Sequence, residues 1–265
     1  MTSATMPQPI ARFLPALTGI FTAVAVLLVL ELLIDADWVN AYLVPPPSAV
    51  LLSFGRMITE EHIAERFLLT AAEALGTGLL LVAVGIPLGL LLHRFPLIRR
   101  ATETWVAAYA SAPLVLAYPL FLVIFGRSAL TIVMIGFFAG LAPVILKTLE
   151  GLTGIRPVLI DVSRSFRLSP AQHFWKVLLP AAAPTIFVGL RLGLIFALIN
   201  IIGVEFLINF GGLGQLINDL AERYDLPGTY AAICFAVLVS VVFFAALERL
   251  ERWYRPARSA ADAEV

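Results

Sequence analysis

Charged residues are scarce in this chain. Only 14% of its 265 residues are Asp, Glu, Lys or Arg, whereas 60% are hydrophobic and the mean hydropathy is +0.95. A soluble domain has about 25% charged residues. The 18 basic and 18 acidic residues cancel, so there is no net charge to attract nucleic acid. The composition excludes an ordinary soluble domain and predicts an integral membrane protein.

Motifs that carry chemistry are also missing. The single cysteine, Cys234, lies in an apolar run, which excludes a disulfide framework or a metal cluster built from thiols. His62, His93 and His173 form no H-E-x-x-H pattern, and no G-x-x-x-x-G-K-[ST] phosphate loop occurs. We therefore expect a chain that is no enzyme, holds no cofactor or metal, and takes any ATP-derived energy from a partner.

What the chain does contain is a set of long apolar runs. A membrane-spanning helix needs about 20 mostly apolar residues. The fifth run carries Arg191 and Glu205, which a rise of about 1.5 Å per residue places roughly 21 Å apart, near opposite membrane faces. The sequence thus predicts an all-α integral membrane protein with six transmembrane helices. The runs are 13–30, 75–92, 104–126, 128–146, 181–207 and 226–247.

The positions of the basic residues indicate the orientation. Six crossings put both termini on one side, and cytoplasmic loops carry an excess of Lys and Arg. With cytoplasmic termini, only four of the 18 basic residues face outward: Arg56, Arg66, Arg127 and Arg223. We expect a cytoplasmic N-terminal segment (1–12), a transmembrane domain (13–250) with a cytoplasmic loop (150–182), and a cytoplasmic tail (251–265).

A charged island interrupts the apolar sequence at residues 161–180, which read DVSRSFRLSPAQHFWKVLLP. Pro157 fits the first turn of a helix that runs to about Phe166, because proline is favoured at the first helical position. The pattern is compatible with two short helices solvated on the membrane surface. It is equally compatible with a docking surface for a soluble partner.

A second helix is predicted to begin inside the island. Ser169 is the N-cap, Pro170 takes the first helical position, and Gln172 completes a capping box three residues after the cap. Because proline breaks helices, Pro180 and Pro184 are expected to separate this helix from the next transmembrane span.

The island resembles the EAA loop of the permease subunits of type I ABC importers, a cytoplasmic segment that seats in a groove of the ATPase subunit. The family's acidic-small-small triplet corresponds to Asp161-Val162-Ser163. Its aromatic-x-x-Val-x-Leu-Pro-like ending corresponds to Phe174, Val177, Leu179 and Pro180.

Arg167 departs from the family pattern, since it stands where the turn glycine usually lies. A residue other than glycine is disfavoured at positive φ. We expect either that this turn has a different shape here or that Arg167 makes its own contact with the partner.

The resemblance covers most of the chain and is closest to the nitrate/sulfonate/taurine-type branch. YLVPPPSAV (42–50), VGIPLGLLL (84–92), LAPVILKTLEGL (141–152), AAAPTIFVGLRLGL (181–194) and VEFLINFGGLGQLI (204–217) match that branch in kind and order. It implies a binding-protein-dependent importer in the bacterial cytoplasmic (inner) membrane. The implied partners are a second permease copy, giving a homodimer, two ATPase subunits that bind ATP and Mg, and an extracytoplasmic substrate-binding protein.

Two groups of candidate functional residues follow. The resemblance implies that residues of the loop 157–180 contact the ATPase, although each could equally be an exposed loop residue without a partner. These are Asp161, Val162, Ser163, Ser165, Phe166, Arg167 and Phe174.

The second group is the expected wall of the translocation pathway. Prolines in the third and fourth spans free backbone carbonyls that can line a polar cavity, although the same helices could be kinked only for packing. Asn200 could line the pathway or join helices, and Glu205 could serve an outer gate or a structural role. The candidates are Tyr109, Ser111, Pro113, Tyr118, Pro143, Asn200 and Glu205.

The family branch suggests a small organic anion as substrate, such as a sulfonate, nitrate or an aromatic acid. A thiamine-precursor-like pyrimidine or another neutral nutrient is the alternative. A stand-alone secondary transporter is more distant, because such a protein needs its own ion-coupling carboxylates. Apart from Glu205, no acidic residue is clearly placed for that role.

Overall fold

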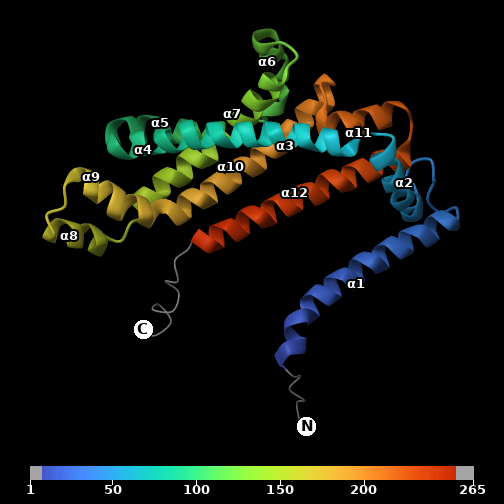
Figure 1. The fold of residues 1–265 in the computed structure, drawn as a ribbon, viewed down its shortest axis with the longest axis horizontal. Helices are drawn as coiled ribbons and strands as arrows, with labels where there is room; N and C mark the ends of the chain where they lie inside the picture. The colour runs from blue at the N-terminus through green and yellow to red at the C-terminus, as the bar shows by residue number, and fades with distance from the viewer. Residues whose placement is uncertain (1–7, 255–265) are drawn as a thin grey trace. The chain divides into compact units, whose positions relative to one another are not determined.

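The computed structural model describes residues 8–254, and within that range every regular element is a helix (Figure 1). The chain divides into two compact units. The first comprises the described part of 1–62 together with 219–234, and the second comprises 63–218 together with the described residues from 235 onward. The predicted all-α class is confirmed.

The first unit contains α1 (Gln8–Asp35) and α2 (Pro47–Thr59), with the end of α11 (Gly212–Glu222) and the start of α12 (Leu226–Tyr254). Two ion pairs join α2 and the residues after it to the α11–α12 connection. They are Arg56 to Asp225, at 2.7 Å, and Arg223 to Glu61, at 2.8 Å.

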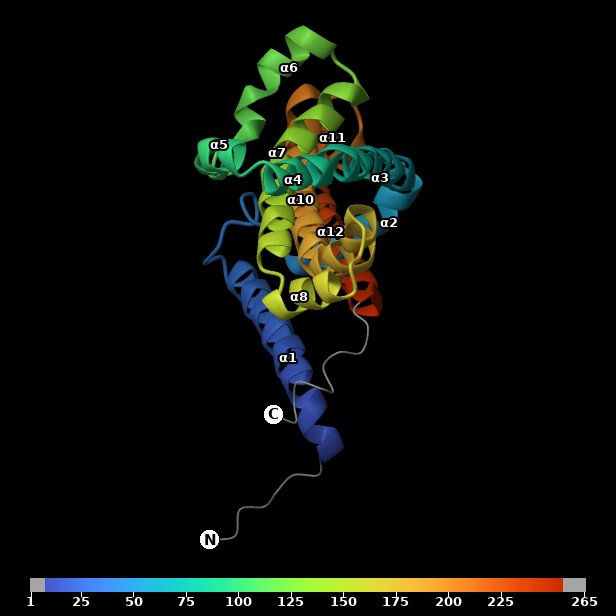
Figure 2. The same ribbon diagram turned by 90° about the vertical axis from the view of Figure 1, so that its left-hand side faces the viewer.

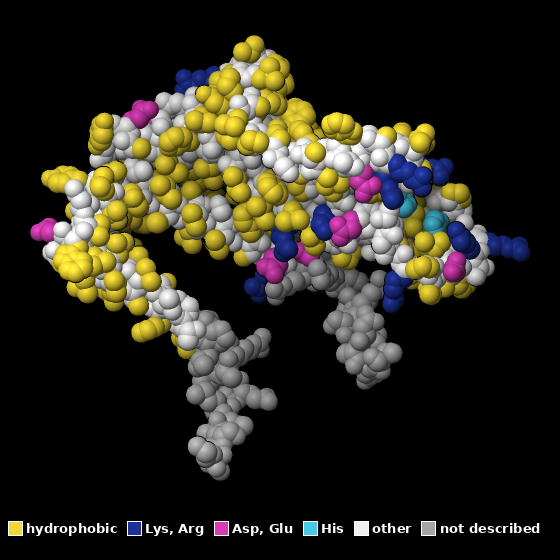
Figure 3. All heavy atoms as spheres, turned by 180° about the vertical axis from the view of Figure 1, so that it is seen from behind, with side chains coloured by type: hydrophobic (Ala, Val, Ile, Leu, Met, Phe, Trp, Pro, Cys, Tyr) yellow, Lys and Arg dark blue, Asp and Glu magenta, His cyan; other side chains and the backbone are white. Residues whose placement is uncertain are grey.

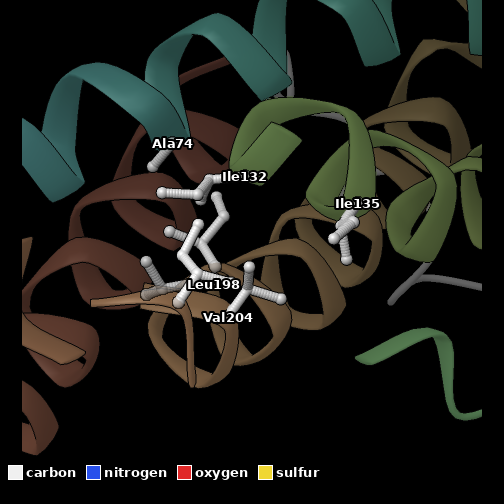
Figure 4. Packing of buried hydrophobic residues seen from close by; sticks show 7 residues of the cluster. Ala74, Ile132, Ile135, Leu198 and Val204 are labelled. Carbon is white, nitrogen blue, oxygen red and sulfur yellow. The ribbon is translucent and has the colours of Figure 1, made fainter. Parts of the chain in front are cut away.

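The second unit is built around α7 (Ala129–Thr153) and α10 (Leu179–Ile208), which lie side by side (Figure 2). The helices come close because both present glycine at their crossing. A Cβ atom built on Gly140 would lie 2.5 Å from the carbonyl oxygen of Gly193. Beside this crossing, α3 (Ile63–Leu80) contributes to an apolar cluster that includes Ala74, Ile132, Ile135, Leu198 and Val204 (Figure 4).

A second helix packs on α7 through small residues. α3 continues through a π-helical turn (Leu81–Gly85) into α4 (Ile86–Arg94), forming one 32-residue apolar span. A Cβ on Gly85 would lie 2.9 Å from Val144 Cγ1, and one on Gly89 would lie 2.6 Å from Thr148 Cβ. These glycines therefore allow α4 to approach α7 closely.

Five described helices are long and apolar enough to cross a membrane, and a bent pair raises the number to six. The third predicted span, 104–126, is the bent pair, so its prediction as one continuous run is wrong. α5 (Pro96–Tyr109) is followed by a 3-10 turn (Leu114–Ala117) and α6 (Tyr118–Phe125), with a bend of 89°. Figure 2 shows the bend between α5 and α6. Pro113 directly precedes the 3-10 turn, and it has no N–H with which to continue the helix.

The loop at 157–180 has the two predicted helices, α8 (Pro157–Ser165) and α9 (Pro170–His173). The capping box is confirmed: Gln172 N donates to Ser169 Oγ, at 3.3 Å, and Ser169 N donates to Gln172 Oε1, at 3.1 Å.

The expected break after α9 is wrong. A π-helical turn (Phe174–Leu178) joins α9 directly to α10, so a 39-residue helical segment runs from Pro170 to Ile208. In the π turn Leu179 N bonds five residues back, to Phe174 O. The hydrogen-bond register therefore changes just before Pro180, and its missing N–H falls at a junction rather than inside a regular helix.

Candidate functional site

The loop formed by α8 and α9 presents apolar side chains on its surface. Phe166 is 76% exposed and Val162 is 48% exposed. Asp161 is also exposed and pairs at 3.4 Å with Arg164 one turn later. Lys and Arg side chains gather at the end of the second unit where α8 and α9 lie (Figure 3). The loop thus combines exposed apolar groups with a positively charged setting.

The turn after α8 has the geometry of a glycine-terminated helix, although it contains no glycine. Arg167 has φ 49°, its N–H donates to Arg164 O, and Leu168 N donates to Ser163 O. These are the two hydrogen bonds of a Schellman motif with a left-handed residue at its end. The expectation of a differently shaped turn is therefore wrong, because Arg167 adopts the conformation that glycine would take.

Ser163 differs from the other candidate contact residues because it is buried, with 3% exposure. Its Oγ lies 2.6 Å from Ile160 O, to which it donates, and 2.8 Å from Nδ1 of His173. Ser163 thus joins α8 to the end of α9 and lies inside the loop. Ser165 and Arg167 are exposed, and Phe174 is half-buried.

Four of the predicted pathway residues line one cavity of about 550 Å³ at the bend between α5 and α6. α7 and α10 provide the remaining wall, and every residue of the lining is uncharged. The four are Tyr109, Ser111, Pro113 and Asn200; the others include Phe138, Ala139, Phe196, Ile199 and Gly203.

The polar groups of this cavity are partly satisfied within the wall. Tyr109 donates its hydroxyl to Phe138 O at 3.0 Å, and Asn200 Nδ2 donates to Phe196 O one turn earlier at 2.8 Å. Pro143 does not line the cavity, but Ala139, four residues earlier, does. Because Pro143 has no N–H, it cannot bond the carbonyl of Ala139. The cavity is weakly polar and can offer hydroxyl, amide and carbonyl groups to a solute.

Besides Pro143, two predicted pathway residues lie outside the lining. Tyr118 packs against the apolar cluster of α3, α7 and α10. Glu205 has 0% exposure and does not line the cavity, and its contacts fit the structural role that the sequence also allowed. Thr70 Oγ1 donates to Glu205 Oε1 at 2.7 Å, and Gly214 N donates to Oε2 at 2.8 Å.

Glycine allows α11 to start directly on this carboxylate. A Cβ on Gly212 would overlap the Glu205 carboxylate, and one on Gly214 would overlap Ile202 O. Gly212 also has φ 77°, a conformation that glycine adopts without strain. Leu213 N donates to Thr70 Oγ1 at 2.9 Å, so Thr70 connects the start of α11 to Glu205.

Sequence reasoning missed Glu73, which lies beside Glu205. Glu73 is 2% exposed, and both of its carboxyl oxygens are buried with no hydrogen-bond donor among the described residues. Its carboxyl group interacts with that of Glu205. Glu73 is the single charged residue between Phe67 and Leu92, and that isolation was the signal that could have identified it.

Comparisons with known proteins place these features in context. Residues 82–256 match the family model described as binding-protein-dependent transport system inner membrane component. The taurine transport system permease protein TauC of Escherichia coli is 26% identical over 223 residues, covering 82% of this chain and 81% of TauC. The formylaminopyrimidine transport permease protein ThiX of Halalkalibacterium halodurans is 25% identical, covering 82% and 86%.

A solved structure shares the fold. The inward-facing MetNI methionine ABC transporter contains a chain that superimposes with a TM-score of 0.64 at 20% sequence identity. The match covers 73% of this chain and 96% of that one. The helical arrangement around α7 and α10 is therefore that of a type I ABC importer permease.

Proposed function

The chain belongs to the family of binding-protein-dependent transport system inner membrane components, and on this premise we propose which partners drive it and what it carries. It is a multi-pass ABC importer permease. We propose that it pairs with a second copy of itself in the bacterial inner membrane. An extracytoplasmic binding protein delivers a small organic anion, and two separate ATPase subunits supply the energy through residues 157–180.

The observation that carries this proposal is the exposed apolar surface of α8. Phe166 and Val162 are exposed on a loop whose helices are fixed by a Schellman turn and a capping box. These apolar groups are held rigidly at the end of the unit where Lys and Arg gather. Such a surface fits a site that another protein covers.

The continuous helix from Pro170 to Ile208 supports a mechanical link between this loop and the cavity. The segment starts at α9 in the loop, and its far part carries Phe196, Asn200 and Gly203 in the cavity wall. When ATP binding closes the two ATPase subunits, α9 moves with them and tilts α10 as a lever. To shift the permease from 1:99 to 99:1, ATP must favour one arrangement by about 5.5 kcal/mol.

The lining of the cavity supports passage of a solute that is selected elsewhere. It offers the hydroxyls of Tyr109 and Ser111 and the amide of Asn200, and it has no carboxylate to repel an anion. Hydroxyl and amide donors suit the oxygens of a sulfonate. The similarity to a taurine permease supports an organic anion.

A neutral pyrimidine is the second candidate, because the same lining also has no cationic side chain to hold an anion. The similarity to a formylaminopyrimidine permease supports this reading. Titrating the cognate binding protein with a sulfonate and with a pyrimidine, by calorimetry, separates the two candidates. Binding of the pyrimidine alone would reject the organic anion.

The ATPase contact is tested with Phe166→Asp, which places a carboxylate on the exposed apolar surface of α8. We expect this variant to lose ATPase subunits during purification and to lose ATP-dependent uptake, while its thermal unfolding is unchanged. Trp38→Asp is the matched control, because Trp38 is also an exposed aromatic residue but lies in the predicted outer segment. Normal ATPase assembly in Phe166→Asp would contradict the proposed contact.

A further inference from the structure

Glu73 of α3 and Glu205 of α10 form a buried carboxyl pair that the transport mechanism does not use. Their exposed fractions are 2% and 0%, and Thr70, three residues before Glu73 on α3, donates to Glu205 Oε1 at 2.7 Å, which places the two carboxyl groups beside each other. Neither has an ion pair with a basic residue among the described side chains. The neighbouring cluster from α3, α7 and α10 is apolar, so the pair lies in surroundings of low polarity.

The two carboxyl groups have different surroundings. Glu205 accepts hydrogen bonds from the hydroxyl of Thr70 and the N–H of Gly214, and it lies at the first turn of the 11-residue helix α11. Hydrogen-bond donors and a helix N-terminus both favour a negative charge. Glu205 is therefore the member of the pair that is equipped to be ionised.

Glu73 has none of this support. Both of its oxygens are buried and receive no donor, whereas the neighbouring Glu205 carboxylate accepts two hydrogen bonds. Two negative charges in contact in a site of low dielectric repel strongly, and a buried ion without donors is costly. One proton removes the second charge and turns Glu73 into a donor.

We propose that Glu73 and Glu205 form a proton-binding site, in which the protonated carboxyl group of Glu73 donates a hydrogen bond to the carboxylate of Glu205. Three donors then converge on Glu205, from Glu73, Thr70 and Gly214. The shared proton fastens the start of α11 to α3 and α10. It is held as a structural component and is not carried across the membrane.

The proton is detected by infrared spectroscopy of the purified full-length chain in detergent at neutral pH. A protonated carboxyl group has a C=O stretch that an ionised carboxylate lacks. The difference spectrum of wild type minus Glu73→Gln is expected to show one such band, shifted to lower frequency after exchange into D₂O. Glu65→Gln on the exposed side of α3 is the matched control, and its difference spectrum is expected to lack the band.

Stability measurements give a second, independent readout. Glu73→Gln keeps a donor in the form of its side-chain NH₂, so its thermal midpoint is expected to stay at or above that of wild type. Glu73→Met keeps the size but removes the donor, and its midpoint is expected to fall. If Glu73→Gln does not fold, the wild type minus Glu205→Gln spectrum takes its place and is expected to show the band at a changed frequency, because Glu73 then donates to an amide oxygen instead of a carboxylate.

Two results would overturn the proposal. The first is a wild-type spectrum without a protonated-carboxyl band that disappears in Glu73→Gln or shifts in Glu205→Gln. The second is a thermal midpoint that rises with NaCl but not with choline chloride, and only while both carboxyl groups are present. That pattern would assign a sodium ion, rather than a proton, to the pair.

Discussion

The carbonyl oxygen of Gly140 in α7 lies 2.7 Å from the position that a Cβ on Gly193 of α10 would occupy, and the reciprocal distance from Gly140 is 2.5 Å. The carbonyl oxygens are backbone atoms, which cannot turn aside, and a Cβ on Gly193 would also lie 2.6 Å from Val144 Cγ2. The crossing of the two central helices therefore depends on the absence of side chains at both positions.

Gly140→Ala is expected to destabilise the protein by about 1–3 kcal/mol, because the added methyl group overpacks the crossing. Gly55→Ala is the control, since nothing lies within 4 Å of its Cβ position in α2. The control is expected to be neutral or to stabilise by about 0.5–1 kcal/mol. Thermal or denaturant unfolding in detergent measures both, and equal stability of the two variants would contradict the tight crossing.

Arg167 combines a left-handed conformation with an exposed side chain. Arg167→Gly is expected to raise stability by about 1 kcal/mol, because glycine adopts positive φ without the Cβ penalty. If the guanidinium contacts the ATPase, the same variant will assemble more weakly although its turn is easier to form. Unfolding and ATPase co-purification are the two measurements, and a more stable variant with unchanged assembly would remove Arg167 from the contact surface.

Ser163 and His173 hold α8 against the end of α9 through a 2.8 Å contact. Ser163→Ala is expected to cost about 1 kcal/mol, the usual value of one buried hydrogen bond, and to lower the solute transported per ATP hydrolysed. Ser240→Ala is the control, because its hydroxyl is also partly buried but bonds within its own helix, α12, to Ala236 O. An unchanged transport-to-hydrolysis ratio in Ser163→Ala would show that this contact does not transmit force.

Asn200 is the amide of the uncharged cavity. Asn200→Leu is expected to lower uptake about fivefold, as for the loss of one hydrogen bond of about 1 kcal/mol to the passing solute. Asn200→Ser keeps a polar group and is expected to retain more activity. Uptake measured at equal ATPase assembly tests this, and full uptake by Asn200→Leu would indicate that the amide only joins helices.

Local sequence signals predicted the parts of this structure that depend on local contacts. The capping box of Ser169 and Gln172 is formed within four residues, and the spans follow from runs of apolar residues, so both could be read directly. Pro180 was misleading because proline disfavours a regular helix, but the preceding π turn changes the register that it would have broken.

The missed features depend on residues that are distant in sequence. The proposed role of Glu73 depends on Glu205, which lies on another helix and comes close only in the folded chain. Glu205 could be identified as a polar residue in a span, but its partners Thr70 and Gly214 could not. The left-handed conformation of Arg167 could not be predicted, because residues other than glycine disfavour positive φ. Here the hydrogen bonds that end the helix outweigh the steric cost of the Cβ atom.

The central claim is that a separate ATPase subunit binds the loop at α8. Its most direct test replaces Phe166 with a photo-crosslinking phenylalanine analogue in the intact cell, irradiates, and identifies the adducts by mass spectrometry. The account predicts one dominant adduct, with a protein that contains a G-x-x-x-x-G-K-[ST] phosphate loop. In the control, Phe166 is unchanged and Trp38 carries the analogue, and this adduct is expected to be absent. Adducts confined to lipid or to extracytoplasmic proteins would contradict it.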